Sequence, residues 1–472
     1  MENKFPKKFN LITYYEEEWE TSKKILLQLK KFSLQKNLSL EEKFNKLSSV
    51  IQIFESKNRF NQFNAEDIIN LHIKKCIGLE KAIKLYFSDE DIFYSKLLPF
   101  IIEQSLLLSE RAKKEYKEQT LPLMISGKNM KEEIPKKLIL SILSNAFFCN
   151  HKDFVSQLNL KQKELTHLEE WCNVDFYWIY SFESSVSIQR IICFLAYFDF
   201  AEKNLESKDN YFESNIIIER IIFNENKIIK HLSECNDIFN ENDINIHNET
   251  MDNPEIITQS IIDFANMDLQ TGQIIPSATQ EEILFSIRPE MYIAMFICQR
   301  IYSNEILIIS GAKQLFEYEG YSNSFKFQKI KEKIDDKNEN ILALDATMFD
   351  HYKYNNVIQD ISKFYTACNF CKQKYSNPSI STGSWGCGAF GCDRAHKFLQ
   401  QLICAKSNHV KLFFSTFGKV DYQNSLNLLF RSVIQFKPKV SDLWNFIIQF
   451  KGNKDDDFHL YLKEKLGNEF YM

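Results

Sequence analysis

The chain changes its sequence pattern at about residue 256, and this change constrains the fold more than any other feature. Before it, apolar residues recur every three or four positions, as in segment 25–32, which predicts helices from residue 11 to about 205. After it, short β-branched runs alternate with helical stretches; the runs are 256–264, 306–309, 341–344 and 410–414. Such alternation predicts parallel βαβ units and a sheet covered by helices on both faces.

These patterns divide the chain into an all-α domain, residues 1–205, and an α/β domain, residues 206–472. Segment 202–254 is polar with one β-branched run, so we expect a connector that carries a strand or short helix. The helices expected in the second domain are 281–302, 352–372, 393–406, 424–434, 440–450 and 457–466. Ligands of such sheets bind beyond the carboxyl ends of the strands, so the loops after the strands should carry the chemistry.

The composition excludes several classes of protein. Hydrophobic residues make up 44% of the 472 residues and the net charge is −5, which argues against nucleic-acid binding, and we expect no direct DNA partner. The eleven Cys are an odd number, and the N-terminus lacks the apolar segment of a signal peptide, which favours a reducing, cytoplasmic or nuclear location. No apolar run approaches the roughly 20 residues that a bilayer requires, so we expect no membrane partner.

One cysteine pattern resembles a four-thiolate zinc site. Cys368 and Cys371 are separated by two residues and precede Cys387 and Cys392. The four residues between the later pair, in a glycine-rich segment, argue against zinc. We therefore do not expect a zinc site here.

Glycine is scarce, which makes one glycine cluster conspicuous. The chain has twelve Gly, yet four of them lie in segment 383–391, just before a predicted helix. Glycines allow positive φ and close approach to a ligand, and successive N–H groups at a helix N-terminus bind anions. We therefore expect this loop to bind phosphate or diphosphate, with a tight structural turn as the alternative. It matches neither a Walker A loop nor a dinucleotide fingerprint.

Two carboxylates, Glu281 and Glu282, begin a long apolar helix. The helix dipole favours acids in the first turn, and Thr279 with Glu282 fits a capping box, so a purely structural role explains them on physical grounds. The functional alternative is a general acid/base beside a sugar-binding carboxylate, as glycosidic cleavage requires. Asp263 and Asn266 follow a predicted strand and would face the same crevice, unless they only terminate the strand.

Aromatic residues follow two further strands. Tyr321 comes after strand 306–309, and Phe417 comes after strand 410–414. Two rings at such loops suit the two faces of an adenine. A hydrophobic plug is the alternative for each residue taken alone.

Taken in order, these segments resemble the poly(ADP-ribose) glycohydrolase family. The resembling segments are IIDFAN (261–266), QEEILFSIRPEM (280–291), EILIISGAKQLFEYEGYSNSF (305–325), ILALDATMF (341–349), GSWGCGAFGCD (383–393) and FSTFG (414–418). Segments of the first half resemble its helical accessory domain: LPLM (121–124), LSNAFFC (143–149) and IICFLAYF (191–198). The resemblance implies a three-layer α/β macrodomain, with a mixed, mostly parallel sheet between helices, preceded by an all-α accessory domain.

The resemblance also implies an activity, the hydrolysis of ribose–ribose O-glycosidic bonds in poly(ADP-ribose), and a role for each site residue. Glu282 would be the general acid/base, while Glu281 and Asn266 would hold the ribose beside the scissile bond. Asp263 would support them, and Gln280 would help to position the ligand. The remaining implied ligand contacts are Tyr321 and Phe417 near the adenine and the bound ribose, and Gly383, Ser384, Trp385, Gly386, Cys387, Gly388 and Ala389 at the diphosphate. The implied partners are poly(ADP-ribose), ADP-ribose and ADP-ribosylated proteins.

One loop departs from the family pattern. The family has three consecutive glycines ahead of QEE, and counting back without a gap places Gln270, Thr271 and Gly272 there. Two further positions of this loop that are small in the family are Ile275 and Ser277 in this chain, with Pro276 between them. Cβ atoms at such positions strain the loop or obstruct the ligand, and a shift of about 1 Å can cost about 10²-fold in rate. The alternative function is therefore a catalytically impaired member that binds ADP-ribose or acts as a scaffold in a larger, for example cytoskeletal, assembly. Another alternative is removal of single ADP-ribose units from protein.

Overall fold

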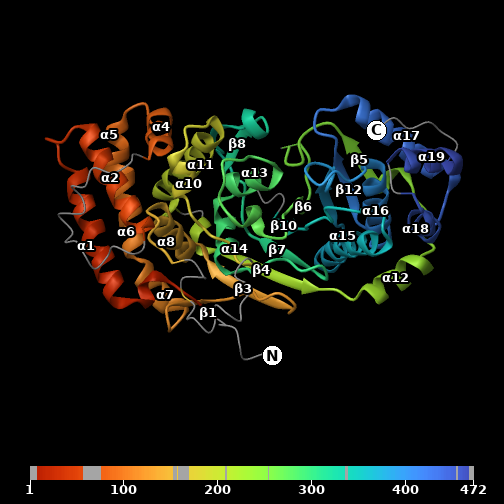
Figure 1. Ribbon diagram of the computed structural model, residues 1–472, viewed down its shortest axis with the longest axis horizontal. Coiled ribbons are helices and arrows are strands. Elements are labelled where there is room, and N and C mark those ends of the chain that lie inside the picture. Colours follow the sequence, from red (N-terminus) through yellow and green to blue (C-terminus); the bar gives the residue numbers. More distant parts are fainter. Residues whose placement is uncertain are drawn as a thin grey trace.

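The computed structural model places the elements in three groups along the long axis of the molecule (Figure 1). N-terminal helices form one end, an eight-stranded sheet lies at the centre, and C-terminal helices form the other end. The structure describes residues 8–56, 76–152, 157, 170–207, 210–253, 255–334, 339–452 and 455–466.

The first half is mainly helical, as its periodicity predicts. Its helices are α1 (Glu16–Ser33), α2 (Leu40–Glu55), α4 (Ile77–Tyr86), α5 (Glu90–Ile92), α6 (Leu98–Leu106), α7 (Leu108–Glu115), α8 (Lys136–Phe147), α10 (Tyr177–Ser181) and α11 (Ser185–Asn204). Helix α11 begins at Ser184, whose side chain accepts a hydrogen bond from the Ser187 N–H, and it is buried on nearly all sides. It packs against α4, α10 and the second domain, so it is a central core helix.

Two departures from the predicted all-helical pattern occur in this half. A short pair of antiparallel strands, β1 (Lys8–Asn10) and β2 (Thr120–Pro122), crosses it, and β3 (Met130–Pro135) joins the main sheet as an edge strand.

One helical stretch of the described residues, Glu90–Glu115, has the length and apolar composition of a membrane span. More than half of its most apolar part is buried, and α6 packs on α1 and α8, as in a core helix.

The main sheet is mixed, with the order β3-β4-β7-β10-β6-β11-β12-β5. Its remaining strands are β4 (Asn215–Ile222), β5 (Ile244–His247), β6 (Ser260–Asp263), β7 (Glu305–Ser310), β10 (Asn340–Ala343), β11 (Ser379–Thr382) and β12 (Lys411–Ser415). The pairs from β10 to β5 are parallel, whereas β3, β4 and β7 pair antiparallel, and β7 also runs antiparallel to β10. The sheet is thus mixed, as the family resemblance implies, but β7, which the β-branched runs placed in a parallel unit, runs antiparallel to both of its neighbours.

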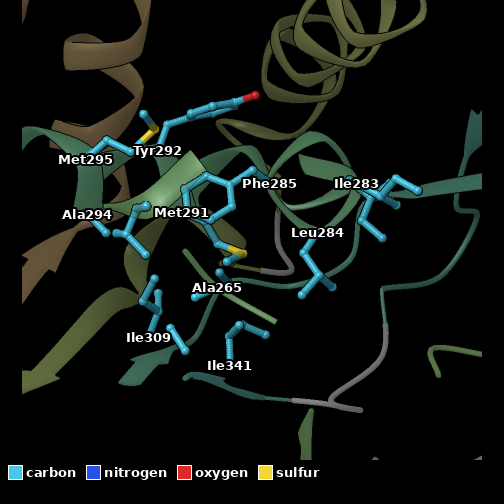
Figure 2. Packing of buried hydrophobic residues seen from close by; sticks show 14 of the residues in the cluster. Ala265, Ile283, Leu284, Phe285, Met291, Tyr292, Ala294, Met295, Ile309 and Ile341 are labelled. Atoms are coloured by element: carbon cyan, nitrogen blue, oxygen red, sulfur yellow. The ribbon is translucent and has the colours of Figure 1, made fainter. Parts of the chain in front are cut away.

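The chain reverses its direction in the sheet between β6 and β7, and two short helices form this connection. The single helix predicted for 281–302 is divided at Pro289 into α13 (Gln280–Ile287) and α14 (Tyr292–Ile297), because proline cannot continue the hydrogen bonding of a helix interior. Figure 2 shows both helices packed over the sheet centre, with Phe285 and Met291 above Ile309 and Ile341. All four side chains are fully buried.

Other helices flank the rest of the sheet. Helix α15 (Tyr354–Lys374) packs on β7 and β11, and α16 (Arg394–Ser407) packs on β12. The elements that complete the fold are α12 (Glu225–Glu234), α17 (Val420–Phe436), α18 (Val440–Gln449), α19 (Asp455–Leu466) and a hairpin of β8 (Phe316–Glu319) and β9 (Lys326–Ile330).

Candidate active site

Three neighbouring parallel strands end at one cavity. Strands β6, β11 and β12 are adjacent, and the loops that follow them line a cavity of about 390 Å³ at Phe264, Gly383 and Thr416. The start of α13 lines it with Thr279 and Gln280. The cavity therefore lies at the carboxyl ends of the strands, as expected for an α/β sheet.

Most of the predicted ligand contacts line this cavity. They are Gln280, Tyr321, Gly383, Ser384, Trp385, Gly386, Cys387, Gly388, Ala389 and Phe417. The rings of Tyr321 and Phe417 meet edge to face, with centroids 5.2 Å apart, and both are partly exposed. The structure thus brings together two aromatic residues that the sequence places on separate loops.

The glycine loop offers unpaired backbone donors. The N–H groups of Gly386, Gly388 and Ala389 donate to no acceptor in the described part of the chain. Gly386 has φ +76°, and an added Cβ would lie 2.7 Å from the Ala346 Cβ, so this position requires glycine. Free N–H groups in such a loop favour an anion.

A buried ion pair supports the loop from below. Trp385 donates its Nε1–H to the Leu344 carbonyl at 2.8 Å, and the Lys397 ammonium lies 4.3 Å from the centre of the Trp385 ring. Lys397 also donates to Asp360, which accepts two further hydrogen bonds from Thr347. Burial lowers the pKa of Lys397, but the charge and hydrogen bond of Asp360, together with Cys392 and Cys387, raise this pKa overall. The lysine therefore stays charged beneath the glycine loop.

Gln280 fastens the start of α13 to the end of β6. Its Oε1 accepts from the Phe264 N–H at 2.8 Å, and its Nε2 donates to the Ile262 carbonyl at 2.9 Å. Glu282 caps the same helix, because its Oε2 accepts from the Thr279 N–H at 2.8 Å and from the Thr279 hydroxyl. The predicted capping box is present, and it fixes the Glu282 carboxylate against Thr279, which lines the cavity.

Glu281, Glu282, Asp263 and Asn266 lie behind the cavity lining, outside the residues that form its surface. Glu281 accepts hydrogen bonds from the backbone N–H groups of Gln270 at 2.9 Å and Asn266 at 3.3 Å. Asp263 is fully buried, and neither of its carboxyl oxygens has a hydrogen-bond partner in the described residues. Three carboxyl groups thus form a buried layer between the sheet and α13.

Burial makes these acids difficult to ionise together. Burial, and then the charges of Asp263 and Glu282, raise the pKa of Glu281 well above its usual range. Burial and the charge of Glu282 raise the pKa of Asp263 in the same way, against the lowering effect of Arg288. Adjacent buried carboxyls therefore resist ionising together. The charge of Glu282 also contributes to the raised pKa of Tyr321, after burial, which places this carboxylate within electrostatic reach of the cavity.

The loop that departs from the family pattern keeps the conformation of glycine. Gln270, Thr271 and Gly272 have φ values of 56°, 57° and 76°. A residue with a Cβ loses about 1–2 kcal/mol in this left-handed region, so the expected strain is present. Gln270, Thr271 and Ile275 lie outside the lining of the cavity, as Glu281 and Glu282 do.

The structure adds residues that sequence reasoning missed. Asp252, in the segment interpreted as a polar connector, lines the cavity and accepts a hydrogen bond from the Tyr318 hydroxyl at 3.0 Å. Arg394 and Lys419 also line it, and the Arg394 guanidinium lies 4.9 Å from the centre of the Tyr422 ring. The position of Arg394 directly after the glycine loop was a usable signal, whereas nothing in the sequence distinguished Asp252.

The cysteines of the zinc-like pattern lie in different environments. Cys368 and Cys371 are buried in α15, and Cys371 donates to the Ser260 hydroxyl at 3.2 Å. Cys387 lies in the glycine loop. Within the described ranges, no three His, Cys, Asp or Glu side chains are grouped as metal ligands.

Comparison with known proteins adds sequence evidence to this geometry. Two family models match: the helical domain of poly(ADP-ribose) glycohydrolase at residues 85–220, and its macro domain fold at residues 229–424. The predicted order of a helical domain and a macrodomain is therefore confirmed.

Curated relatives carry the same family name. Poly(ADP-ribose) glycohydrolase 1 of Caenorhabditis elegans is 28% identical over 268 residues, which cover 51% of this chain and 32% of that protein. Poly(ADP-ribose) glycohydrolase 2 of that organism is 30% identical over 34% of this chain and 37% of its own length, and poly(ADP-ribose) glycohydrolase 1 of Arabidopsis thaliana is 23% identical over 44% and 50%. The chain thus spans about a third to a half of the length of these relatives. Because the two family models together match more than half of its residues, the chain belongs to the poly(ADP-ribose) glycohydrolase family.

Proposed function

We propose that this chain hydrolyses the ribose–ribose O-glycosidic bonds of poly(ADP-ribose) and releases ADP-ribose. One observation carries the proposal: an anion-binding glycine loop, a pair of aromatic rings and the capped end of a carboxylate-bearing helix meet at one cavity. Each part suits a different part of ADP-ribose.

Each part of the site is assigned to one part of ADP-ribose. The free N–H groups of Gly386, Gly388 and Ala389 suit the diphosphate, and Lys397, paired with Asp360, packs against Trp385 of the same loop. The rings of Tyr321 and Phe417 suit the adenine and its ribose. The ribose of the scissile bond then lies toward the start of α13.

Glu282 is the proposed general acid. It donates a proton to the departing ribose oxygen as the glycosidic C–O bond breaks; the carboxylate then removes a proton from the water that attacks the anomeric carbon. The reaction therefore returns the proton to Glu282. The charge of Glu282 contributes, after burial, to the raised pKa of the cavity residue Tyr321, which supports a place for this carboxylate near the ligand.

In this proposal Glu281 acts indirectly, by holding the backbone at Gln270 and Asn266. Both of its oxygens accept backbone N–H groups, so it holds Gln270 and Asn266 in place behind the cavity. Gln280 acts similarly by fixing α13 to β6.

The test is release of ADP-ribose from purified poly(ADP-ribose) by the wild type, Glu282→Gln and Glu42→Gln. Glu42 is a matched control, because it closes a capping box with Ser39 at the start of α2, in the helical domain. We expect release by the wild type and by Glu42→Gln, and a loss of about 10²–10⁴-fold in Glu282→Gln, the usual contribution of a general acid.

Other outcomes would contradict the proposal. No release by the wild type, with calorimetric binding of ADP-ribose, would make the chain a binding or scaffold protein. Release only from protein that carries single ADP-ribose units would assign it the mono-ADP-ribose reaction.

A further inference from the structure

A buried arginine of the helical domain contacts loop 270–277, behind the candidate active site. Arg190 lies in α11 and is only 2% exposed. All five of its N–H donors bond to neutral acceptors, which is the full capacity of a guanidinium group. Such complete pairing of a buried charge fixes the position of every group that it contacts.

The partners of Arg190 belong to two segments. In loop 270–277 it donates to the Gln270 Oε1 at 2.6 Å and to the carbonyls of Ile275 and Ser277 at 2.6 and 3.1 Å. On the helices that follow, it donates to the Ser286 hydroxyl at 3.3 Å and the Tyr292 hydroxyl at 3.0 Å. Arg190 therefore fastens both ends of the loop to α13 and α14.

The loop requires such a fastening because Gln270 is not glycine. At φ 56° its backbone is in a region that a side chain disfavours. The hydrogen bond to Arg190 holds the Gln270 side chain inside the protein, away from the cavity lining. In the same conformation the Gln270 N–H donates to the Glu281 carboxylate at 2.9 Å.

We infer that Arg190 is a positioning residue for the proposed reaction: through it, the helical domain holds loop 270–277 against Glu281 and α13. A glycine would adopt this left-handed conformation without strain. At Gln270, the hydrogen bond between its side chain and Arg190 holds the backbone in that conformation instead. This inference rests on the proposed function for its kinetic readout, but the holding of the loop is measurable without turnover.

The first measurement is hydrogen exchange of the backbone amides of loop 270–277, in the wild type and in Arg190→Met. We expect at least tenfold faster exchange at Gln270 and its neighbours in the variant. The matched control is Arg111→Met, because Arg111 donates to Gln104, Lys137 and Ser141, all within the helical domain. The control should leave exchange of the loop unchanged.

The second measurement is kinetic. We expect Arg190→Met to lower kcat by about 10²-fold, as for a displacement of about 1 Å in catalytic groups, with a smaller change in KM. Arg190→Lys, with three donors instead of five, should fall between the wild type and Arg190→Met. Gln270→Gly should reduce the kcat loss that Arg190→Met causes, because glycine adopts the left-handed conformation without an anchor.

The outcomes separate this inference from the proposed function. Equal effects of Arg190→Met and Arg111→Met on loop exchange would overturn the inference, even with an active wild type. An inactive wild type whose loop exchange still depends on Arg190 would overturn the proposed function alone. If Arg190→Met does not fold, Gln270→Ala replaces it, and unchanged exchange of the loop in that variant would also overturn the inference.

Discussion

Thr271 provides a direct test of the strain in loop 270–277. Its φ and ψ are 57° and 25°, in the left-handed region that is unfavourable for a β-branched residue. Its side chain is exposed, and its hydroxyl donates to the neighbouring Gln270 carbonyl at 2.6 Å. Replacement therefore changes backbone preference with little loss of packing.

The magnitude follows from comparing Thr271→Gly with Thr271→Ala. Both variants lose the same hydroxyl, so this loss cancels. Alanine keeps the left-handed cost of about 1–2 kcal/mol, which glycine avoids. Glycine gains about 0.4–1 kcal/mol of extra freedom in the unfolded chain, which opposes this. We expect Thr271→Gly to be more stable than Thr271→Ala by about 0.5–1 kcal/mol.

The control reverses the sign. Thr21 lies within α1, and its hydroxyl donates to the Glu17 carbonyl at 3.1 Å. Inside a helix, glycine is less favourable than alanine by about 1 kcal/mol, so Thr21→Gly should be less stable than Thr21→Ala. A general effect of glycine would have the same sign at both positions.

The assay is urea unfolding followed by circular dichroism, with the two variants of each pair compared at their midpoints. A higher midpoint for glycine at position 271 and for alanine at position 21 is the expected result. If alanine equals or exceeds glycine at position 271, the reasoning about left-handed strain is refuted.

Two further predictions concern the acids and the glycine loop. The pKa of Asp263 is raised in the folded chain, so folding binds a proton and stability falls as pH rises above the unfolded pKa of about 3.9. Asp263→Asn should therefore raise Tm relative to the wild type more at pH 8 than at pH 5, and an offset independent of pH would contradict this. Gly386→Ala should weaken calorimetric ADP-ribose binding and lower Tm, because its Cβ would meet Ala346 at 2.7 Å and φ is +76°. Wild-type values for both would refute that reasoning, whereas Gly388→Ala, with open space around its Cβ, should keep the Tm.

Several features of this fold were predictable because neighbouring residues encode them. The core helix α11 follows from its apolar segment, and the capping box at Thr279 and Glu282 follows from two residues three positions apart. The glycine loop was visible because glycine is rare elsewhere in the chain. Strand β11 was missed because its four residues, Ser379–Thr382, lack a distinct β-branched run.

Other features depend on contacts between distant segments. The reversed direction of β7 depends on how the chain returns to the sheet after α13 and α14. The residues Glu281 and Asn266 were expected at the ligand, yet Glu281 binds the backbone of the loop, which adjacent sequence does not reveal.

The sequence by itself determined most of the helices, the change from a helical half to an α/β half, the helix caps and the glycine loop, because these depend on the preferences of residues within a few positions. Only the tertiary structure decided how the site is held. Arg190 meets Gln270 across 80 residues, and Trp385 meets the Leu344 carbonyl across 41. Such contacts form only when whole elements pack, so burial, charge pairing and the support of the loops are properties of the folded chain.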